Sequence, residues 1–436
     1  MNPGPIVAAA TPWGRGAISV VRLSGADPEL LLRFCRPKGG FPTPRRARLC
    51  SFFDADGDFD EGLLTFFSGP NSVTGEHVAE LGCHGNPLVV ERLVAAAVGA
   101  GARVARPGEF TRRAVLNGKM DLTRAEAVLQ AIEAATPAGL RVARAGLDGA
   151  VATLVQQLRD GLVDAIAELE ARLDYPNDEL TYEADDALCA RLVVLADRAR
   201  SSADTYVAGR RLVEGATVAL MGPVNAGKSS LFNALGGSER ALVSPTPGTT
   251  RDVVERQVRL GSVAVRLLDT AGLRQDPEVL EAEGLRLARH LAAEADLWVV
   301  VVPAHAPEQA DASLASARGR PHLVVFNHAD RAPVPTGLAT CAATGEGVSA
   351  LADAIAEALV GEQLGGELVI ASARQRDRLL DVERHLRSAV NALPAAGPAV
   401  SAEELYGALE RLNELSGSDV REEVLDRLFS RFCIGK

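Results

Sequence analysis

The feature that most constrains this chain is a glycine-rich segment that directly follows a short apolar run. Residues 216–221 read Ala-Thr-Val-Ala-Leu-Met, and residues 222–230 read Gly-Pro-Val-Asn-Ala-Gly-Lys-Ser-Ser. This spacing is typical of a phosphate loop between a buried strand and a helix, because the backbone N–H groups of such a loop point at phosphate oxygens. Lys228 would reach the β- and γ-phosphates, and Ser229 would bind Mg²⁺. The pattern therefore predicts an α/β domain that binds a nucleoside triphosphate, with a helix over residues 230–235.

Two motifs downstream predict a switch that responds to the γ-phosphate. A strand expected over residues 263–268 leads into Asp269-Thr270-Ala271-Gly272. An aspartate at this place holds Mg²⁺ through water, and the glycine N–H meets the γ-phosphate. Between the two motifs lies Gly248-Thr249-Thr250-Arg251-Asp252. Thr250 would complete the Mg²⁺ shell only while the γ-phosphate is present, so this loop is expected to be ordered in one nucleotide state and released in the other.

The next motifs indicate which base the domain selects. Two more apolar strands are expected over residues 297–302 and 322–326, and the second ends in Asn327-His328-Ala329-Asp330. Asp330 can accept the N1–H and N2–H groups of guanine, which adenine does not offer, and Cys341-Ala342-Ala343 could supply a backbone N–H to the guanine O6. His328 stands where lysine is usual, and Cys341 stands where serine is usual. We interpret both departures as tuning of affinity.

The residues that place the attacking water cannot follow the small-GTPase scheme. Leu273 follows Gly272, where a glutamine would orient the water. Asn225 offers a second lead, because its amide oxygen lies where a monovalent cation could bridge to the phosphates and do the work of an arginine finger. The other candidates are the acids and arginines of the switch segments, Asp276, Glu278, Glu281, Glu283, Arg251 and Arg274.

Length and composition limit the classes that remain. A chain of 436 residues should hold roughly two to four domains. Its net charge of −11 argues against a broad basic surface that grips nucleic acid, so any RNA contact must be local. The six cysteines form no Cys-x-x-Cys pair, which suits a reducing cytosol and implies no structural metal. We expect a cytoplasmic protein, because neither a secretion signal nor an apolar run of membrane-spanning length is evident.

Changes in sequence texture divide the chain into four expected parts. Residues 1–118 have the short strands and turns of a separate α+β domain, and residues 211–366 hold the nucleotide-binding motifs. Residues 119–210 and 367–436 both carry apolar residues at helical spacing. Each of these two blocks presents an apolar face too long to remain exposed, so we expect them to pack on one another. The nucleotide domain would then be an insertion within a helical domain.

Outside the nucleotide domain, the sequence predicts individual helices, strands and helix caps. Thr123 and Glu126 are interpreted as a capping box, and Ser401 as the residue that opens a helix. The apolar face of the second helical block is expected at residues 379, 382, 386, 390 and 393. The remaining expected elements are strands over 18–23 and 63–67, and helices over 87–98, 151–173 and 419–429.

Motifs at both ends of the chain resemble the MnmE (TrmE) family of tRNA modification GTPases. The resemblance covers nearly the whole chain, and the amino-terminal motifs are more specific than the GTPase motifs, which many proteins share. It implies a multidomain protein in which a P-loop GTPase (α/β) domain is inserted in an all-helical domain and is preceded by an α+β tetrahydrofolate-binding domain. The motifs are residues 10–17, 20–25, 69–72, 74–76, 106–110 and 116–119, the switch 248–252, and the tail Phe432-Cys433-Ile434-Gly435-Lys436.

The resemblance implies a homodimer formed by the amino-terminal domains. Each domain would have a pocket for a one-carbon donor of the 5-formyl-tetrahydrofolate type. The matching positions for the folate are Arg22, Glu80, Lys119 and Lys436. Arginine and lysine suit the carboxylates and carbonyls of a folate, and glutamate can accept the N–H groups of the pterin. Cys433 would lie near the one-carbon group as a candidate catalytic thiol, although taken alone it reads as a small buried hydrophobe.

In the nucleotide domain, the resemblance assigns Glu281 as the residue that orients the water, with Lys228 and Thr250 as its catalytic partners. It implies Mg²⁺ at Ser229 and Thr250. It also implies K⁺ at Asn225, Ser244, Thr246 and Thr249, where the ion would close two GTPase domains face to face. The expected nucleotide-binding residues are Asn225, Ala226, Gly227, Lys228, Ser229, Ser230, Ser244, Pro245, Thr246, Pro247, Gly248, Thr249, Thr250, Asp269, Thr270, Ala271, Gly272, Asn327, His328, Ala329, Asp330, Cys341, Ala342 and Ala343.

The function that the resemblance implies is K⁺-dependent GTP hydrolysis coupled to modification of the tRNA wobble uridine, position 34, at C5. The product would be an aminomethyl-type group such as carboxymethylaminomethyl. A flavin-dependent partner, MnmG (GidA), would share the chemistry in a heterotetramer. This chain has no Gly-x-Gly-x-x-Gly after a strand, so FAD is expected on that partner. Two alternatives stay open: a ribosome-assembly GTPase of the Era or Der type, and a stand-alone folate-dependent transferase with a regulatory GTPase.

Overall fold

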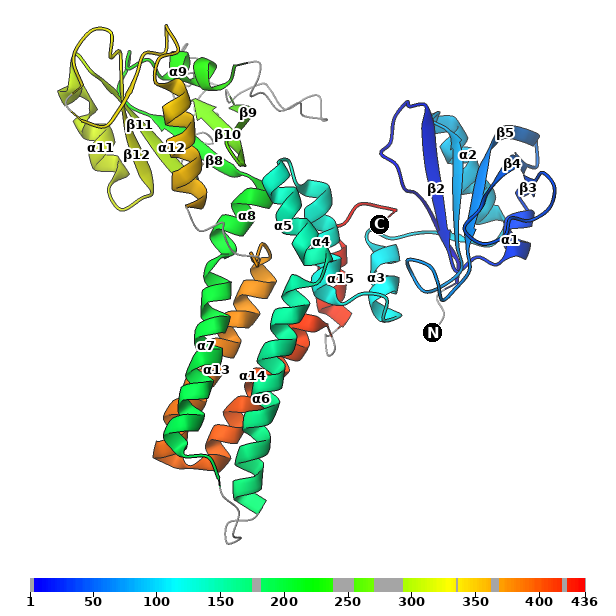
Figure 1. Ribbon diagram of the computed structural model, residues 1–436. Helices are drawn as coiled ribbons and strands as arrows, with labels where there is room; N and C mark the ends of the chain where they lie inside the picture. Colours follow the sequence, from blue (N-terminus) through cyan, green and yellow to red (C-terminus); the bar gives the residue numbers. More distant parts are fainter. Residues whose placement is uncertain are drawn as a thin grey trace, which may run out of the picture. The chain divides into compact units, whose positions relative to one another are not determined.

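The computed structural model describes seven segments of the chain and is shown in Figure 1. Its residues fall into two compact units, Met1–Ala125 with Asn413–Lys436, and Glu126–Leu412. These units do not coincide with the four domains expected from sequence texture, and that finer division stays a prediction. No helix in the described segments is long and apolar enough to cross a membrane. The described segments are residues 4–174, 182–237, 255–269, 293–334, 336–361, 368–417 and 422–435.

The first unit is built on a seven-stranded sheet with the strand order β3-β4-β5-β6-β2-β1-β7. All neighbours are antiparallel except β1 and β7. The strands predicted over 18–23 and 63–67 lie within β2 and β5, and the predicted helix over 87–98 corresponds to α2. The strands are β1 (Ile6–Ala9), β2 (Ile18–Ser24), β3 (Cys35–Pro37), β4 (Ala47–Asp54), β5 (Gly57–Phe67), β6 (Val78–His84) and β7 (Arg103–Val104), and the helices are α1 (Pro28–Leu32), α2 (Pro87–Gly99), α3 (Glu109–Leu116) and α15 (Glu422–Phe429).

The two faces of this sheet differ in polarity and burial. Alternate strand residues, such as Leu23 and Leu64, join the core that packs against α2. On the opposite face, Leu49 and Leu63 lie directly across from each other on β4 and β5, and they are 41% and 50% exposed. Ile18 of β2 is 70% exposed. The first unit therefore presents apolar side chains on the face that α2 does not cover.

The end of the chain packs on the same unit. The backbone carbonyl of Cys433 accepts from the Gly108 N–H at 3.4 Å, at the start of α3. Gly435 has φ +97°, and a Cβ there would lie 2.2 Å from the carbonyl oxygen of Ala9. Only glycine can therefore bring the tail this close to β1. The carbonyl of Gly435 accepts from Nη1 of Arg22 at 3.5 Å, so the tail reaches the middle of the sheet.

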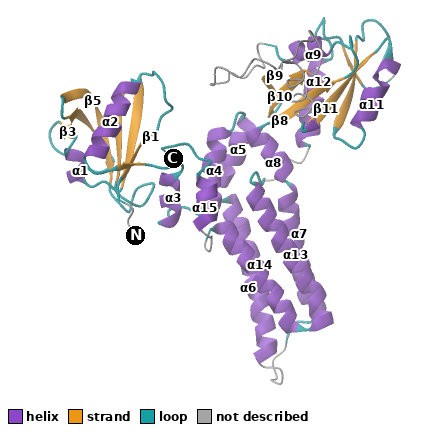
Figure 2. Cartoon of the chain, turned by 180° about the vertical axis from the view of Figure 1, so that it is seen from behind, coloured by secondary structure: helices purple, strands orange, loops and turns teal. Residues whose placement is uncertain are grey.

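Long helices from both sides of the nucleotide domain pack together, as their apolar faces predict. Figures 1 and 2 show α6, α7, α13 and α14 side by side. Leu192 of α7 and Leu386 of α13 are fully buried, and the Cys189 thiol donates to the carbonyl of Val390 at 3.7 Å. The helices are α4 (Leu122–Glu133), α5 (Pro137–Leu147), α6 (Ala150–Asp174), α7 (Asp185–Asp204), α8 (Tyr206–Glu214), α13 (Ala373–Ala396) and α14 (Pro398–Ser416).

The predicted capping box at the start of α4 is wrong. The helix begins at Leu122, and Asp121 accepts from the Arg124 N–H at 3.0 Å, so Asp121 serves as the N-terminal cap. Thr123 lies inside the helix and donates its hydroxyl to Asp121. Glu126, the expected partner of Thr123, is 5% exposed and is occupied elsewhere. Its carboxylate accepts from Ser372, Arg374 and Gln375 at the start of α13, and these buried bonds outweigh a local capping contact.

The predicted start of α14 at Ser401 is also wrong. The helix begins three residues earlier, at Pro398, because proline is pre-organised for the first turn of a helix. Ser401 is fully buried, and its hydroxyl donates to the carbonyl of Ala389 at 3.0 Å. This serine therefore joins α14 to α13 instead of capping a helix.

The nucleotide domain of the second unit is a six-stranded sheet in the order β13-β12-β11-β8-β10-β9. All neighbours are parallel except β9 and β10, so the carboxyl ends of β8, β10, β11 and β12 meet at one edge. Helices α9 and α12 join the core on one face, and α11 packs on the other. The elements are β8 (Ala216–Met221), β9 (Glu255–Leu260), β10 (Val263–Asp269), β11 (Leu297–Pro303), β12 (His322–Asn327), β13 (Leu338–Thr340), α9 (Lys228–Leu235), η2 (Pro307–Ala310), α11 (Asp311–Ala317) and α12 (Val348–Val360).

Candidate functional site

The phosphate loop, residues 222–229, connects β8 to α9 at the carboxyl edge of the sheet. Its backbone includes two left-handed residues, Asn225 with φ +61° and Gly227 with φ +84°. A Cβ at Gly227 would lie 2.1 Å from Nδ2 of Asn327, which belongs to the end of β12. Glycine is thus required at 227 both by the backbone conformation and by the packing of Asn327 against the loop.

Lys228 is the cation of this loop and is only 6% exposed. Its ammonium donates to the carbonyls of Gly222 and Pro223, at 3.0 and 2.7 Å. These bonds hold the side chain across the mouth of the loop, where an ammonium can meet phosphate oxygens. Because Lys228 opens α9, the partial positive charge of the helix N-terminus adds to that of the lysine.

Two oxygen donors at the same edge fit a Mg²⁺ ion. Asp269 ends β10 and is 3% exposed, and it lies opposite Leu220, one residue before the end of β8. Ser229 presents a hydroxyl from the first turn of α9. A carboxylate and a hydroxyl beside a phosphate loop are ligands that Mg²⁺ prefers. No group of three or more histidine, cysteine or acidic side chains elsewhere in the described segments could hold a metal ion.

Asn327 connects the phosphate loop to the segment after β13. The side chain is fully buried, and its Nδ2 donates to the carbonyl of Ala226 at 2.9 Å. Its Oδ1 accepts from the Ala342 N–H at 3.2 Å and from the Thr340 hydroxyl at 3.3 Å. The Ala342 N–H, one of the three expected to face the guanine O6, therefore donates to Asn327.

Asp330 is the predicted base-recognition residue, and the structure gives it an unexpected partner. The Cys341 thiol beside Asp330 keeps the pKa of that carboxyl below its ordinary value. Cys341 is 2% exposed, and a serine is usual at this position. The thiol thus supports the ionised form of Asp330, which is the form that accepts two N–H groups from guanine.

Several predicted residues lie outside the described segments, so their roles stay predictions. They include most of the switch, the water-orienting residue and the end of the tail. Asn225 is the single predicted K⁺ ligand that the structure describes. The predicted residues that lie outside the described segments are Ser244, Pro245, Thr246, Pro247, Gly248, Thr249, Thr250, Arg251, Asp252, Thr270, Ala271, Gly272, Arg274, Asp276, Glu278, Glu281, Glu283 and Lys436.

In the first unit, two of the predicted folate residues form a pair beside the tail. Arg22 of β2 and Glu80 of β6 are opposite in register, and Nη2 and Nε of Arg22 donate to Glu80 at 2.7 and 3.0 Å. The guanidinium lies 6.0 Å from the ring centre of Phe110. Cys433 is exposed, so the interpretation of this residue as a buried hydrophobe is wrong.

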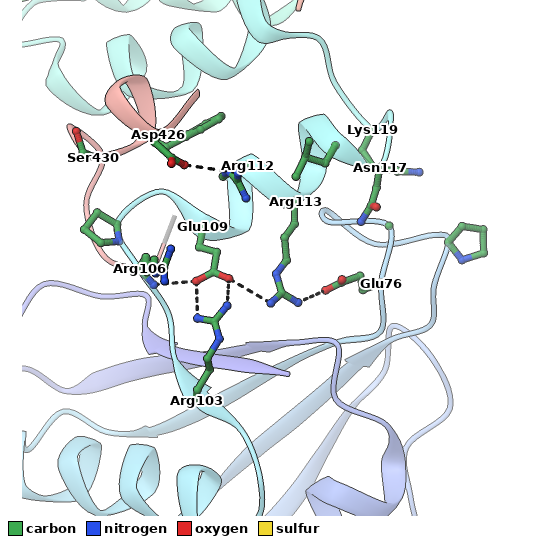
Figure 3. A pocket seen from close by; sticks show the side chains of 15 residues that line it. Glu76, Arg103, Arg106, Glu109, Arg112, Arg113, Asn117, Lys119, Asp426 and Ser430 are labelled. Carbon is green, nitrogen blue, oxygen red and sulfur yellow. Dashed lines mark hydrogen bonds and ion pairs between the residues drawn. The ribbon is translucent and has the colours of Figure 1, made fainter. Parts of the chain in front are cut away.

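A cavity of about 1350 Å³ lies between α3, α15 and the loop that precedes β6, and we call it the charged cavity (Figure 3). Lys119 lines the charged cavity, whereas Arg22 and Glu80 are not among its lining residues. Sequence reasoning did not identify its ion pairs, although the 106–110 motif contained Glu109. The charged lining residues are Glu76, Arg103, Arg106, Glu109, Arg112, Arg113, Lys119 and Asp426.

Glu109 is the centre of the ion-pair network in the charged cavity. Arg103 donates to it at 2.8 Å, and Arg113 donates both to Glu109 at 3.2 Å and to Glu76 at 2.8 Å (Figure 3). Burial alone would raise the pKa of Glu109. The bonds from Arg103, from the Arg106 N–H and from Arg113 outweigh that effect and lower the pKa to about 2.

These features define a class of protein. A phosphate loop, a Mg²⁺-type carboxylate and a guanine-type aspartate at one edge of a parallel sheet are the parts of a P-loop protein that binds guanine nucleotides. Two family models extend beyond this domain: "GTP-binding protein TrmE N-terminus" matches residues 5–119, and "MnmE helical domain" matches residues 122–433.

Comparison with known proteins identifies the family. The chain is 43% identical to "tRNA modification GTPase MnmE" of Myxococcus xanthus and 40% identical to the protein of that name from Akkermansia muciniphila. Each match covers 99% of this chain and 98% of the relative. The chain belongs to the MnmE family. Among solved structures, the G domain of the T. maritima FeoB iron transporter is 27% identical, with a TM-score of 0.26, and the match covers 33% of this chain and 98% of that chain.

Proposed function

We propose that this chain is a GTP hydrolase that acts in tRNA modification. The observation that carries the proposal is the meeting of Lys228, Asp269 and the β12 loop, residues 327–330, at one edge of the sheet. Relatives that match over 99% of the chain are named tRNA modification GTPases, which supports the same role. Hydrolysis would drive a conformational change and would not itself be the modification.

The described residues have distinct parts in GTP binding and hydrolysis. The loop amides and Lys228 would hold the phosphates, and Asp330 would accept the guanine N1–H and N2–H. Ser229 and Asp269 would hold Mg²⁺, which when bound neutralises charge on the phosphate oxygens. Thr250 would report the γ-phosphate, and Glu281 would orient the attacking water. Asn327 holds the β12 loop against the phosphate loop through its hydrogen bond to the carbonyl of Ala226.

K⁺ is the proposed source of the charge that a small GTPase obtains from an arginine. The left-handed backbone of Asn225 supports this role, because it fixes the residue at the outer turn of the phosphate loop. Ser244, Thr246 and Thr249 would complete the shell. Hydrolysis measured in K⁺ and in Na⁺ at equal ionic strength tests the proposal. A strong loss of rate in Na⁺, and equal rates in both salts for Asn225→Ala, are expected; equal rates for the unaltered chain would contradict the cation mechanism.

The first unit is proposed to bind a one-carbon donor of the 5-formyl-tetrahydrofolate type. Arg22 and Glu80 lie beside the tail that carries Cys433, and Lys119 lines the neighbouring charged cavity. Lys436 would reach the same region. Calorimetry with 5-formyl-tetrahydrofolate should show binding that Arg22→Gln weakens at least tenfold. Arg46→Gln, an exposed arginine elsewhere in the unit, is the control, and equal loss in both variants would refute the assignment.

The first unit is also proposed to form a homodimer. The exposed pair Leu49 and Leu63, opposite each other on β4 and β5, and Ile18 on the same face of the sheet support this proposal, because exposed apolar side chains gathered on one face often mark a protein–protein contact. Sedimentation should give a dimer that Leu63→Lys dissociates. A dimer that survives this substitution and the matching change at Leu49 would place the contact elsewhere.

The proposed modification is an aminomethyl-type group at C5 of the wobble uridine, installed with the flavoprotein MnmG (GidA) in a heterotetramer. FAD would be held by that partner, and the complex would work in the cytoplasm. Mixing the two purified proteins should give a complex in size-exclusion chromatography. Formation of the modified nucleoside on unmodified tRNA should require both proteins, GTP and K⁺. Modification by this chain alone would favour the stand-alone transferase.

A further inference from the structure

His328 occupies the position where a lysine is usual in the base-recognition motif, and its surroundings give it a specific role. Its backbone is left-handed, with φ +63°, which is uncommon for a residue other than glycine. Such a conformation persists when neighbouring contacts determine it. The contacts of the His328 ring therefore indicate what this residue does.

The first contact is with the phosphate loop. Nε2 of His328 lies 3.4 Å from the carbonyl oxygen of Asn225. Because a carbonyl only accepts, this bond requires a hydrogen on Nε2. Asn327, one residue earlier, donates to the carbonyl of Ala226 at 2.9 Å. Two consecutive side chains of the β12 loop thus bind two consecutive carbonyls of the phosphate loop.

The second contact is with another histidine. The rings of His305 and His328 are 5.6 Å apart between centroids and are tilted by 59°. His305 follows the end of β11, and the neighbouring Ala304 N–H donates to the carbonyl of Asn327 at 2.8 Å. The segment after β11 is therefore fixed against the β12 loop by a backbone bond, and this places His305 beside the ring of His328.

We propose that His305 and His328 together replace the single lysine of the usual motif and position the phosphate loop for guanine nucleotides. His328 holds the loop through the carbonyl of Asn225, and His305 holds the His328 ring in the orientation that this bond requires. An imidazole has a shorter reach than a lysine stem, so its bond to Asn225 requires one ring orientation, and the contact with the His305 ring favours that orientation. The inference rests on the proposed binding of GTP. Both histidines are positioning residues, since they act on the nucleotide through the loop.

The test is a double-mutant cycle on nucleotide affinity in the full-length protein. Dissociation constants for GDP and GTP would be measured at fixed Mg²⁺ and K⁺ for His328→Ala, His328→Lys, His305→Ala and the double variant His305→Ala/His328→Lys. His328→Ala should weaken binding about threefold to tenfold, the loss expected for one hydrogen bond at a solvent-exposed position. His328→Lys should bind within about twofold of the unaltered chain. His305→Ala should weaken binding about threefold with His328 present and leave it unchanged in the lysine background.

Three further measurements separate positioning from a general structural effect. His322→Ala, at the opposite end of β12, is the matched control and should leave affinity unchanged. His328→Gln retains an N–H donor and should lose less affinity than His328→Ala. The kcat at saturating GTP should stay within about twofold in every variant, and KM should rise only in those variants whose affinity is weakened, because the loop is positioned before the chemical step.

Two results would overturn the proposal. One is an unchanged affinity in His328→Ala, which would show that the bond to Asn225 has no role. The other is an equal loss on replacing His305 in the histidine and lysine backgrounds, which would show that the two rings act independently. Should His328→Ala fail to fold, the comparison of the lysine and glutamine variants decides the same question. An unaltered chain that binds neither GDP nor GTP would refute the proposed function itself, a result distinct from these two.

Discussion

The phosphate loop presents its ligand groups from consecutive residues, whereas the charged cavity of the first unit collects them from separate parts of the chain. Between Gly222 and Ser229, backbone N–H groups and one lysine act within a single turn. In the charged cavity, Glu76, Arg103 and Glu109 come from different segments, and Asp426 comes from near the end of the chain. One site depends on backbone conformation and the other on long-range ion pairs.

This difference determines how each site responds to substitution. A site made of backbone N–H groups loses its ligand when a new side chain changes the backbone conformation of the loop. The charges of nearby side chains have little influence on that conformation. A network of buried ion pairs tolerates changes in shape but fails when one charge is removed, because its partner then remains buried without compensation.

Gly227→Ala should have the largest effect. The new methyl group would lie 2.1 Å from Nδ2 of Asn327, and alanine is disfavoured at φ +84°. We expect nucleotide affinity to fall more than about a hundredfold, measured with a fluorescent GDP analogue, because the loop and the β12 loop must separate. Gly237→Ala is the control, since its nearest contact would be 3.6 Å away. Wild-type affinity in Gly227→Ala would show that the loop is not held as described.

Glu109→Gln should destabilise the first unit by about 3 kcal/mol, because it takes one of two carboxylate partners from the buried Arg113 and also removes the partner of the partly exposed Arg103. Hydrogen exchange of the α3 amides in the full-length protein measures this loss. GTP hydrolysis should be unaffected. If the α3 amides kept their protection, the network would have no stabilising role.

The same carboxylate predicts an acid-dependent change in stability. Its pKa is about 2 in the folded protein and 4.5 ordinarily, so it contributes fully above about pH 4.5 and loses its contribution as the pH falls toward 2. The difference in stability between the unaltered chain and Glu109→Gln should therefore shrink across this window. A difference that stays constant from pH 6 to pH 2.5 would argue against the ion-pair origin of the shift.

Asp296→Asn sharpens the comparison, because it removes an ion pair from the unit that holds the phosphate loop. Burial would raise the pKa of Asp296, but the Thr217 N–H, Arg210 and Arg211 outweigh it and lower the pKa. We expect a loss of about 1–2 kcal/mol in the free energy of unfolding, with nucleotide affinity unchanged. A large loss of nucleotide affinity would show that the charge of Asp296, just before β11, also influences the conformation of the phosphate loop.

Asp58→Asn should have the smallest effect. Its carboxylate pairs with Arg36 at 3.1 Å, and both side chains are more than half exposed, at 53% and 62%. An exposed pair of this kind contributes roughly 0–0.5 kcal/mol. Chemical denaturation of this variant beside Glu109→Gln separates buried from exposed ion pairs in one unit. Equal losses would mean that burial does not control the strength of the pairs.

The sequence predicted strands and helices whose conformation depends on residues close to one another in the chain. The strand over 216–221 is β8, and the expected strand over 263–268 is β10 without its final aspartate. A prediction from neighbouring residues was wrong at the start of α4. Asp121 caps this helix where Thr123 was expected, because Glu126 bonds to Ser372 at the start of α13 instead of completing a capping box. A capping pattern in the sequence indicates which residues could cap a helix. Tertiary contacts determine which of them forms the cap in the folded protein.

Sequence reasoning missed contacts at two ranges. Glu76 and Arg113 are 37 residues apart, and no spacing rule connects them. Arg113 lies four residues after Glu109 on α3, so helical spacing could have indicated this pair, whereas Arg103 meets Glu109 across the turn between β7 and α3. Resemblance pointed to Glu109 through a motif, yet it did not indicate the arginines that lower the pKa of this residue.

The most direct test of the whole account is nucleoside analysis of bulk tRNA from cells that lack this chain. The account predicts that the aminomethyl-type group at C5 of the wobble uridine disappears, that the unaltered gene restores it, and that a gene encoding Gly227→Ala does not. Wobble uridines that remain fully modified without the chain would contradict the account.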